Sequence, residues 1–336
     1  MNLGDIAVPA HSLSAADQGL VDGVLAGQRR SLAKAITLVE STRADHQQRA
    51  QQMLNALLPS TGKAIRIGIS GVPGAGKSTF IEALGIWLIE RGKKLAVLAV
   101  DPSSSVSGGS ILGDKTRMEL LSQRQEAFIR PSPSAGSLGG VAEKTREAML
   151  LCEASGYDVI VVETVGVGQS ETTVAGMVDM FCLLQLPNAG DDLQAIKKGI
   201  VEIADLVVIN KADIDRQATA VVRAQWRNAL HMLRPASANW SPPVITLSAL
   251  HKEGIADFWA EVEKYQAALK PTGEFERKRQ HQALSWLWQL IDSGLRRHFR
   301  HHPRVRENLP ELTRSVESGQ TTPAAAAHAL LDYLKH

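Results

Sequence analysis

Residues 65–78 read Ile65-Arg-Ile-Gly-Ile-Ser-Gly-Val-Pro-Gly-Ala-Gly-Lys-Ser78 and join an apolar run of strand length to a complete G-x-x-x-x-G-K-S phosphate loop. Apolar side chains in residues 79–90 recur at helical spacing, so the loop lies between a predicted strand and a predicted helix. Unpaired amides at such a loop and helix start attract phosphate. Lys77 would reach the β and γ oxygens, and Ser78 would bind Mg2+. We expect nucleotide contacts from Gly74, Ala75, Gly76, Lys77, Ser78 and Thr79.

A second motif, Asn210-Lys-Ala-Asp213, follows the predicted strand 205–209 and indicates which base is bound. Asp213 can accept hydrogen bonds from guanine N1–H and the 2-amino group, Asn210 can bond the base edge, and Lys211 can lie along its face. Adenine lacks both donors, and sites of this type discriminate by about 10^4 to 10^5. After the next predicted strand, 244–247, a backbone amide would reach guanine O6. The sequence predicts GTP, with base contacts from Asn210, Lys211, Asp213, Ser248, Ala249 and Leu250.

Carboxylates at strand ends are the candidates for holding Mg2+. Asp101 follows the predicted strand 95–100, where it could bind the ion directly or through water, although a helix N-cap or Asx turn is the alternative. Asp114 is a weaker candidate. Glu163 stands where most GTPases carry Asp, in the segment 157–166. The metal candidates are thus Ser78, Asp101, Asp114 and Glu163, and the catalytic candidates are Lys77, Asp101 and Glu163.

The end of that segment predicts how hydrolysis is sensed. Gly166 would donate its amide to the γ-phosphate, so that hydrolysis breaks a contact and releases the following loop. The next residue is Val167, which cannot position water as a glutamine does, and Gln169 is out of register for that role. We therefore expect slow intrinsic hydrolysis.

The alternation of strands and helical stretches predicts an α/β fold, a doubly wound, mostly parallel sheet in a P-loop GTPase domain over 63–268. An N-terminal helical extension covers 1–62, with two helices joined near residues 40–42. The C-terminal region, 269–336, carries one helix to Pro303 and a last helix capped by Thr322. Its tail suggests an association surface, and packing on its own domain is the alternative. An apolar stripe in it comprises Leu284, Leu287, Trp288, Ile291 and Leu295.

The composition limits which other classes of protein the chain could belong to. With 336 residues, 44% hydrophobic, the chain can build a large core, and its net charge of +2 argues against nucleic acid as a partner. No apolar run approaches the roughly 20 residues of a membrane span. Cys152 and Cys182 have the apolar surroundings of core thiols in a reducing compartment, and the N-terminus lacks targeting features. We expect a cytoplasmic protein.

Four long motifs resemble the methylmalonyl-CoA mutase-associated GTPases, the MeaB/ArgK-type chaperones. They are Gly71–Ser78 with Val100-Asp-Pro-Ser-Ser104, Gly109-Ser-Ile-Leu-Gly-Asp-Lys-Thr-Arg-Met118, Glu163-Thr-Val-Gly-Val-Gly-Gln-Ser-Glu171 and Gly190-Asp-Asp-Leu-Gln-Ala-Ile-Lys-Lys-Gly199. The resemblance runs over nearly the whole chain. Glu163 in place of Asp is what this group of metal- and cofactor-chaperone GTPases leads one to expect.

The resemblance implies a homodimer whose partner is an adenosylcobalamin-dependent methylmalonyl-CoA mutase or related acyl-CoA mutase. The GTPase would gate cofactor loading and promote release of damaged cobalamin. It also makes 187–199 a third switch, with Gln169, Asp191 and Lys197 as partner-signalling residues. Two other functions remain open: a metallochaperone GTPase for nickel or cobalt, and a nucleotide-dependent protein kinase.

Overall fold

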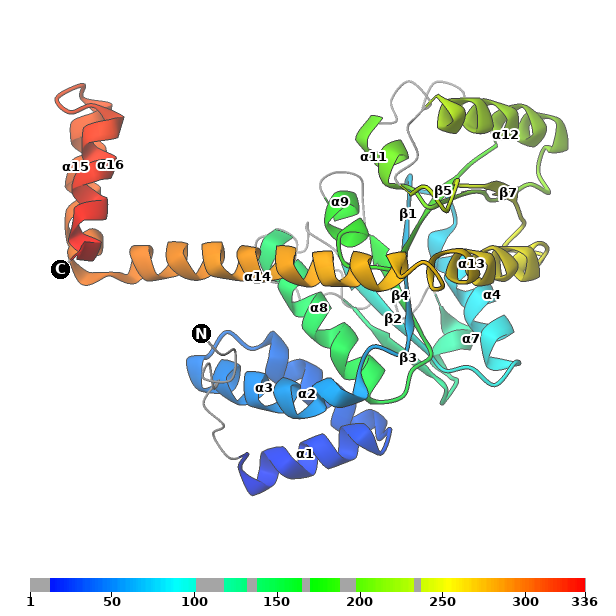
Figure 1. The fold of residues 1–336 in the computed structure, drawn as a ribbon, viewed down its shortest axis with the longest axis horizontal. Helices are drawn as coiled ribbons and strands as arrows, with labels where there is room; N and C mark the ends of the chain where they lie inside the picture. The colour runs from blue at the N-terminus through cyan, green and yellow to red at the C-terminus, as the bar shows by residue number, and fades with distance from the viewer. Residues whose placement is uncertain are drawn as a thin grey trace. The chain divides into compact units, whose positions relative to one another are not determined.

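A computed structural model describes residues 13–100, 118–131, 138–164, 170–187, 198–232 and 237–335. Its centre is a seven-stranded sheet, every pairing parallel, in the order β3-β2-β4-β1-β5-β6-β7 (Figure 1). The strands are β1 Ile65–Gly71, β2 Leu95–Val100, β3 Ala127–Arg130, β4 Val159–Thr164, β5 Met180–Gln185, β6 Leu206–Ile209 and β7 Val244–Thr246. The predicted α/β fold with a doubly wound parallel sheet is confirmed.

The chain winds outward from β1 to β2 and β3, returns to β4, and continues on the other side of β1 with β5, β6 and β7. Ligands of open parallel sheets bind at the carboxyl ends of the strands where the winding reverses. The described helices are α1 Ala15–Leu25, α2 Arg29–Glu40, α3 Ala44–Leu57, α4 Lys77–Ile89, α7 Glu119–Ser122, α8 Leu138–Ala154, α9 Ser170–Ala175, α11 Lys198–Ile203, α12 Arg216–His231, α13 Ile255–Leu269, α14 Glu274–His301, α15 Pro303–Glu317 and α16 Pro323–Asp332.

Alternate residues of the strands face opposite sides of the sheet, where they supply separate buried clusters. Ile67 and Ile69 of β1 belong to the cluster beneath α4 and α13, where the rings of Phe80 and Phe258 meet edge to face with centroids 4.8 Å apart. The opposite face of the sheet packs against α8 and the N-terminal helices, and its cluster includes Ile160 of β4. Burial on both faces explains why these strands read as continuous apolar runs.

The N-terminal region differs from the sequence prediction. We predicted two helices over residues 15–59, but the structure has three, because α1 already ends at Leu25. Gly27 follows with φ +70, a left-handed conformation that glycine adopts without strain and that turns the chain into α2. Asp17 of α1 is buried and accepts a hydrogen bond of 2.8 Å from Arg49 of α3, which holds the pKa of Asp17 below its ordinary value.

Edge strand β3 was also missing from the sequence prediction. Its four residues, Ala127–Arg130, are too short a run to stand out, and Glu126 and Arg130 bracket the three apolar residues. The strand pairs with β2 through Leu95, Val97 and their neighbours. The predicted state of the two cysteines is confirmed, since Cys152 and Cys182 are free and buried, and burial raises the pKa of both thiols.

The first turns of α14 are fixed to the amino edge of the sheet. Arg279 donates to both carboxylate oxygens of Asp179, which precedes β5, at 2.6 Å, and to the carbonyl oxygens of Gly62 and Ala64. Lys278 donates to Asp205 Oδ2 at 3.0 Å, just before β6. Charged groups that are buried this far require such pairing. The contacts therefore tie the start of α14 to β1, β5 and β6.

The structure divides into two compact units, residues 1–279 and 280–336. Within the second unit, α15 and α16 pack together around Val305 and Leu330. Two predicted helix signals are confirmed: α14 ends before Pro303, and the Thr322 hydroxyl caps α16 by accepting from the Ala325 amide. None of the helices described here combines the length and apolar character needed to cross a membrane.

Candidate nucleotide-binding site

The phosphate loop leaves β1 at Gly71 and enters α4 at Lys77, and close neighbours require glycine at Gly71 and Gly76. A Cβ at Gly71 would lie 2.3 Å from the Leu184 carbonyl oxygen, and one at Gly76 would lie 2.6 Å from Asn210 Nδ2. Gly76 also has φ +83 and is the N-cap of α4, so no side chain caps the first amides of the helix. Those amides are the donors that phosphate oxygens accept from at helix starts.

Lys77 lies across the loop in the first turn of α4. Its Nζ donates to the Gly71 carbonyl oxygen at 2.8 Å and approaches that of Val72 at 3.4 Å. The ammonium is thus held over the concave side of the loop by carbonyl dipoles. Gly74, at φ +80, completes the turn and the buried Ala75 follows it. Thr79 lies in the same helical turn as Lys77 and Ser78.

Ser78 and Glu163 come together although 85 residues separate them in the chain. The Ser78 hydroxyl donates to Glu163 Oε1 at 3.2 Å, and Glu163 is only 5% exposed. Glu163 stands near the carboxyl end of β4, paired in register with Ile69 of β1. A hydroxyl and a carboxylate are the hard oxygen donors that Mg2+ prefers, so these two side chains fit that ion.

The buried Asn210, 1% exposed, joins three of the sequence motifs. Its Nδ2 donates to the Ala75 carbonyl oxygen of the phosphate loop at 2.8 Å. Its Oδ1 accepts from the Lys211 amide at 2.8 Å and from the Ala249 amide at 3.0 Å. The side chain of Asn210 therefore forms its hydrogen bonds with protein atoms. It sets the spacing between the phosphate loop and the two predicted base-reading loops, residues 210–213 and 248–250.

The base-reading loops are held in an unusual backbone state. Lys211 has φ +61, which costs a non-glycine residue roughly 1–3 kcal/mol and needs support from its surroundings. That support includes the Ala212 amide, which donates to the Leu247 carbonyl at 3.1 Å. Ser248 is buried and exchanges backbone hydrogen bonds with Glu253. Leu250, at the end of this loop, is 73% exposed.

Asp213 is set up as an acceptor. A hydrogen bond from Ser248 is the main cause holding the pKa of Asp213 below its ordinary value, and the charges of His251 and Lys211 act in the same direction. The carboxylate is therefore ionised at neutral pH and can accept two N–H donors. His251 Nε2 lies 3.6 Å from Asp213 Oδ2. Sequence reasoning missed His251 because a lone histidine after the motif carries no pattern.

The structure thus brings Lys77, Ser78 and Glu163 to one end of the site and Asn210 with Asp213 to the other. The remaining predicted residues lie outside the described part of the chain. They are Asp101, Asp114, Gly166, Gln169, Asp191 and Lys197.

Comparison with known proteins agrees with this geometry. A profile of the family described as "Methylmalonyl Co-A mutase-associated GTPase MeaB" matches residues 32–304. A "Putative GTPase" of Caulobacter vibrioides is 52% identical over 96% of this chain and 98% of its own. "GTPase ArgK" of Escherichia coli is 47% identical over 92% and 94%. The mouse "Methylmalonic aciduria type A homolog, mitochondrial" is 50% identical over 96% and 81%.

A solved structure has the same fold over almost the whole chain. It is described as "Crystal structure of LAO/AO transport system kinase", has a TM-score of 0.76 and 39% sequence identity, and covers 97% of this chain and all of its own.

Replacing Asp213 by Asn tests the base-reading site. An amide can donate to the C2 carbonyl of xanthine but cannot accept two donors from guanine, so preference should move from GTP to xanthosine triphosphate. We expect the GTP dissociation constant to rise by about 100-fold or more, measured by competition with a fluorescent nucleotide. Asp215→Asn is the matched control, because Asp215 caps α12 and Asn caps a helix equally well. Retained GTP selectivity in D213N would show that the base is read elsewhere.

Proposed function

The chain belongs to the methylmalonyl-CoA mutase-associated GTPase family and is a GTPase, and we propose that it is a chaperone of an adenosylcobalamin-dependent acyl-CoA mutase of the methylmalonyl-CoA mutase type. In this role it gates cofactor loading and promotes release of damaged cobalamin. The observation that carries the proposal is that the family match spans all four nucleotide motifs together with most of α2, all of α3 and all of α14. The name of the mouse relative points to the same metabolic step.

Binding of GTP uses the groups at the carboxyl edge of the sheet. The amides at the start of α4 and the Lys77 ammonium neutralise the triphosphate, and the ammonium exchanges its carbonyl partners for phosphate oxygens. Asp213 accepts from the two guanine donors. Asn210 keeps the phosphate loop at a fixed distance from the base loops, so both ends of the nucleotide are bound by a preformed frame.

Mg2+ is the cation that fits this donor set. Ser78 and Glu163 would hold it, with Asp101 and Asp114 as further proposed ligands in the region that follows β2. When bound, the ion neutralises charge on the β- and γ-phosphates. Ser78 would give up its hydrogen bond to Glu163 so that its oxygen lone pair faces the ion.

The signal to the partner comes from the γ-phosphate. Gly166 would donate its amide to it, and loss of the phosphate would release the loop that contains Gln169. We place the response in 187–199, with Asp191 and Lys197 as the residues that meet the mutase. Val167 gives no means of positioning water, which accounts for a slow reaction in the absence of the partner.

The GTPase contributes no cobalamin chemistry. It can only shift the mutase between conformations, by as much as its affinities for them differ, which is typically about 1–3 kcal/mol of coupling. Coupling is reciprocal for binding, so the nucleotide state changes mutase affinity and the mutase changes nucleotide affinity. We propose the cytoplasm as the location, in line with two buried, unbridged cysteines.

A second candidate function is phosphotransfer, which the word "kinase" in the description of the 39% identical solved structure favours. Transfer would place the γ-phosphate on a protein acceptor, whereas hydrolysis releases it into solution. GTP labelled at the γ-phosphate distinguishes the two, since only a kinase leaves label on protein.

We propose that the chain forms a homodimer through α14. The apolar stripe Leu284, Leu287, Trp288, Ile291 and Leu295 is exposed along this helix, with Trp288 64% and Leu295 62% accessible. Repeats at i, i+3, i+4 and i+7 form a single face that helices bury against another element. A second copy offers an identical stripe, and large exposed apolar patches usually mark an interface.

Phosphate release from GTP, with and without a purified adenosylcobalamin-dependent mutase from the same source, tests the chaperone role. We expect a slow basal rate that the mutase raises about tenfold or more, because the partner completes the catalytic arrangement. Lys77→Ala should abolish phosphate release both with and without the mutase. This variant therefore also controls for contaminating phosphatase. A rate unaffected by any such mutase would contradict the chaperone role and leave the GTPase assignment intact.

Charge placed in the stripe tests the dimer. Leu287→Glu should shift the chain from dimer to monomer in sedimentation experiments, because a carboxylate would be buried against apolar side chains. Ser293→Glu is the matched control, since Ser293 lies on the same helix about 180° from the centre of the stripe. A monomeric parent protein, or a dimer unaffected by L287E, would exclude this interface.

A further inference from the structure

A groove follows the outer edge of β7. Among the described residues, β7 is the last strand of the sheet and pairs only with β6, while α12 and α13 lie to either side of it. Two cavities, of about 450 and 770 Å3, open along this edge and share Arg223 and Arg227 in their linings. Of the described residues that line the first cavity, none belongs to a nucleotide motif, whereas the second cavity is also lined by Ala212, Asp213 and Ser248 of the predicted base-reading loops.

The outer edge of β7 has backbone groups that face away from the sheet. Val207 donates to the Pro243 carbonyl at 3.1 Å, and Leu247 donates to the Ile209 carbonyl at 3.0 Å. Because backbone groups alternate along a strand, residues 243, 245 and 247 face β6, whereas Val244 and Thr246 turn their N–H and C=O groups outward.

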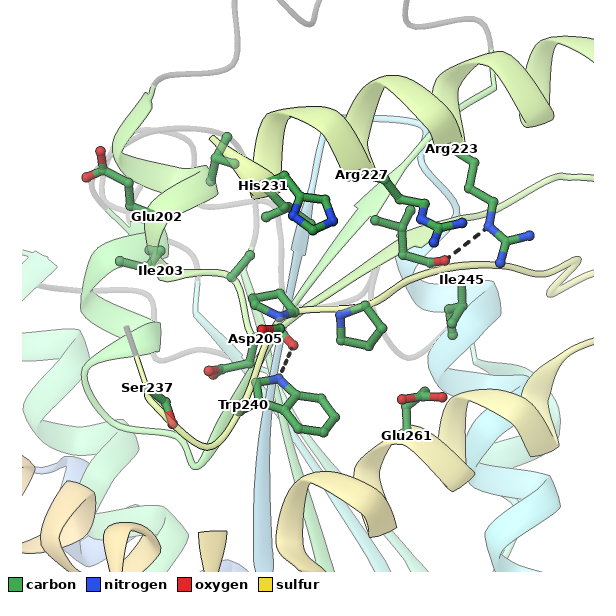
Figure 2. A pocket seen from close by; sticks show the side chains of 17 residues that line it. Glu202, Ile203, Asp205, Arg223, Arg227, His231, Ser237, Trp240, Ile245 and Glu261 are labelled. Atoms are coloured by element: carbon green, nitrogen blue, oxygen red, sulfur yellow. Dashed lines mark hydrogen bonds between the residues drawn. The ribbon is translucent and has the colours of Figure 1, made fainter. Parts of the chain in front are cut away.

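A contact of Arg223 confirms that the Val244 carbonyl faces outward and accepts a hydrogen bond there. Its Nε donates to the Val244 carbonyl oxygen at 3.3 Å, as Figure 2 shows. A side chain here supplies the hydrogen bond that the amide of an adjacent strand would give. Strand edges with free hydrogen-bonding groups are templates for pairing with another chain, and a charged side chain over the edge hinders nonspecific pairing.

The two walls of the groove carry opposite charge. Arg216, Arg223, Arg227 and His231 recur every four or seven residues on α12, and all four are exposed. Glu261 of α13 faces them, and Trp240 lies between, with its indole N–H donating to the Asp205 carbonyl at 2.8 Å (Figure 2). Side chains of a strand added to β7 would point alternately to the basic α12 wall and to the α13 wall.

The length of the basic wall sets the size of the occupant. From residue 216 to residue 231, α12 rises about 22 Å, at 1.5 Å per residue. An extended chain covers that distance with about seven residues, at 3.3 Å each. Three or four of their side chains would face the basic wall.

We propose that this groove binds an extended, acidic segment of a partner protein as an added strand beside β7. An amide of the segment replaces Arg223 Nε at the Val244 carbonyl, and a carbonyl of the segment accepts from the Thr246 amide. Arg223, once displaced, pairs with an acidic side chain of the segment, as does Arg227. Main-chain hydrogen bonds then provide affinity, and the alternate carboxylates provide specificity. The proposal is independent of the mutase role.

A second copy of this chain is a poorer occupant. Two β7 strands pairing antiparallel about a twofold axis would form one continuous sheet, with α12 of both copies on the same face. The basic wall of one copy would then lie beside the basic wall of the other, and like charges across an interface disfavour association. Residues 241–247, Ser-Pro-Pro-Val-Ile-Thr-Leu, supply no carboxylate to offset that repulsion.

The test uses a fluorescein-labelled peptide, Thr-Glu-Thr-Glu-Thr-Glu-Thr, and the full chain in an anisotropy titration. We expect saturable binding that weakens about tenfold or more in Arg227→Glu, and also when alternate peptide amides are N-methylated. Gln225→Glu is the matched control, because Gln225 is exposed on α12 but does not line the groove. The peptide should slow amide hydrogen exchange in residues 244–247, and R227E should keep the parental GTPase rate.

Three outcomes would overturn the proposal. One is no saturable binding up to about 1 mM peptide. Another is binding that N-methylation or R227E leaves unchanged, which would indicate nonspecific charge attraction. The third is that R227E alters the oligomeric state of the protein alone, which would make a second copy the occupant.

Discussion

The buried amide of Asn210 is the contact through which the nucleotide site is assembled. Its Nδ2 fixes the Ala75 carbonyl of the phosphate loop, and its Oδ1 fixes the amides of Lys211 and Ala249. These three segments follow β1, β6 and β7, and the sheet alone does not set the conformation of loops beyond the strand ends. Because the side chain is 1% exposed, removing its partners would leave a buried polar group unsatisfied, at a cost of about 1–3 kcal/mol.

Other parts of the site depend on the hydrogen bonds that Asn210 makes. The hydrogen bond from the Lys211 amide to Asn210 supports the left-handed conformation of Lys211, which directs the chain toward Asp213. Gly76 must lack a Cβ because Asn210 Nδ2 would be 2.6 Å away from it. The Ser78–Glu163 pair at the other end rests on a different constraint, the parallel register of β1 with β4. The Ser78–Glu163 pair is thus positioned separately from the loops that Asn210 joins.

Much of this architecture could be predicted from the sequence because it rests on local patterns. Buried parallel strands such as Leu95–Val100 are continuous apolar runs. The glycines, lysine and serine of the phosphate loop have the spacing that is typical of nucleotide phosphate binding. The break between α1 and α2 and the four-residue β3 were missed, since a single glycine and a three-residue apolar run are common in any context. The link made by Asn210 could not be foreseen, because it depends on 135 residues of intervening chain.

Residues outside the motifs were the least predictable. His251 acts on Asp213 through a contact that only the fold creates, and Arg223 covers the free edge of β7 from a helix whose sequence looks like an ordinary exposed surface. In both cases the sequence shows a polar or charged, exposed side chain with many possible roles. Only the three-dimensional structure shows which group each of these side chains contacts.

The most direct test of the account is the GTP affinity of Asn210→Asp. Aspartate keeps the volume and one acceptor oxygen but replaces the donor to Ala75 by a second oxygen, so the phosphate loop and the base loops would be pushed apart. We predict that the dissociation constant for GTP rises about 5- to 150-fold, equivalent to about 1–3 kcal/mol, while Asn228→Asp on the exposed face of α12 leaves it unchanged. Parental GTP affinity in N210D would contradict the claim that this amide assembles the site.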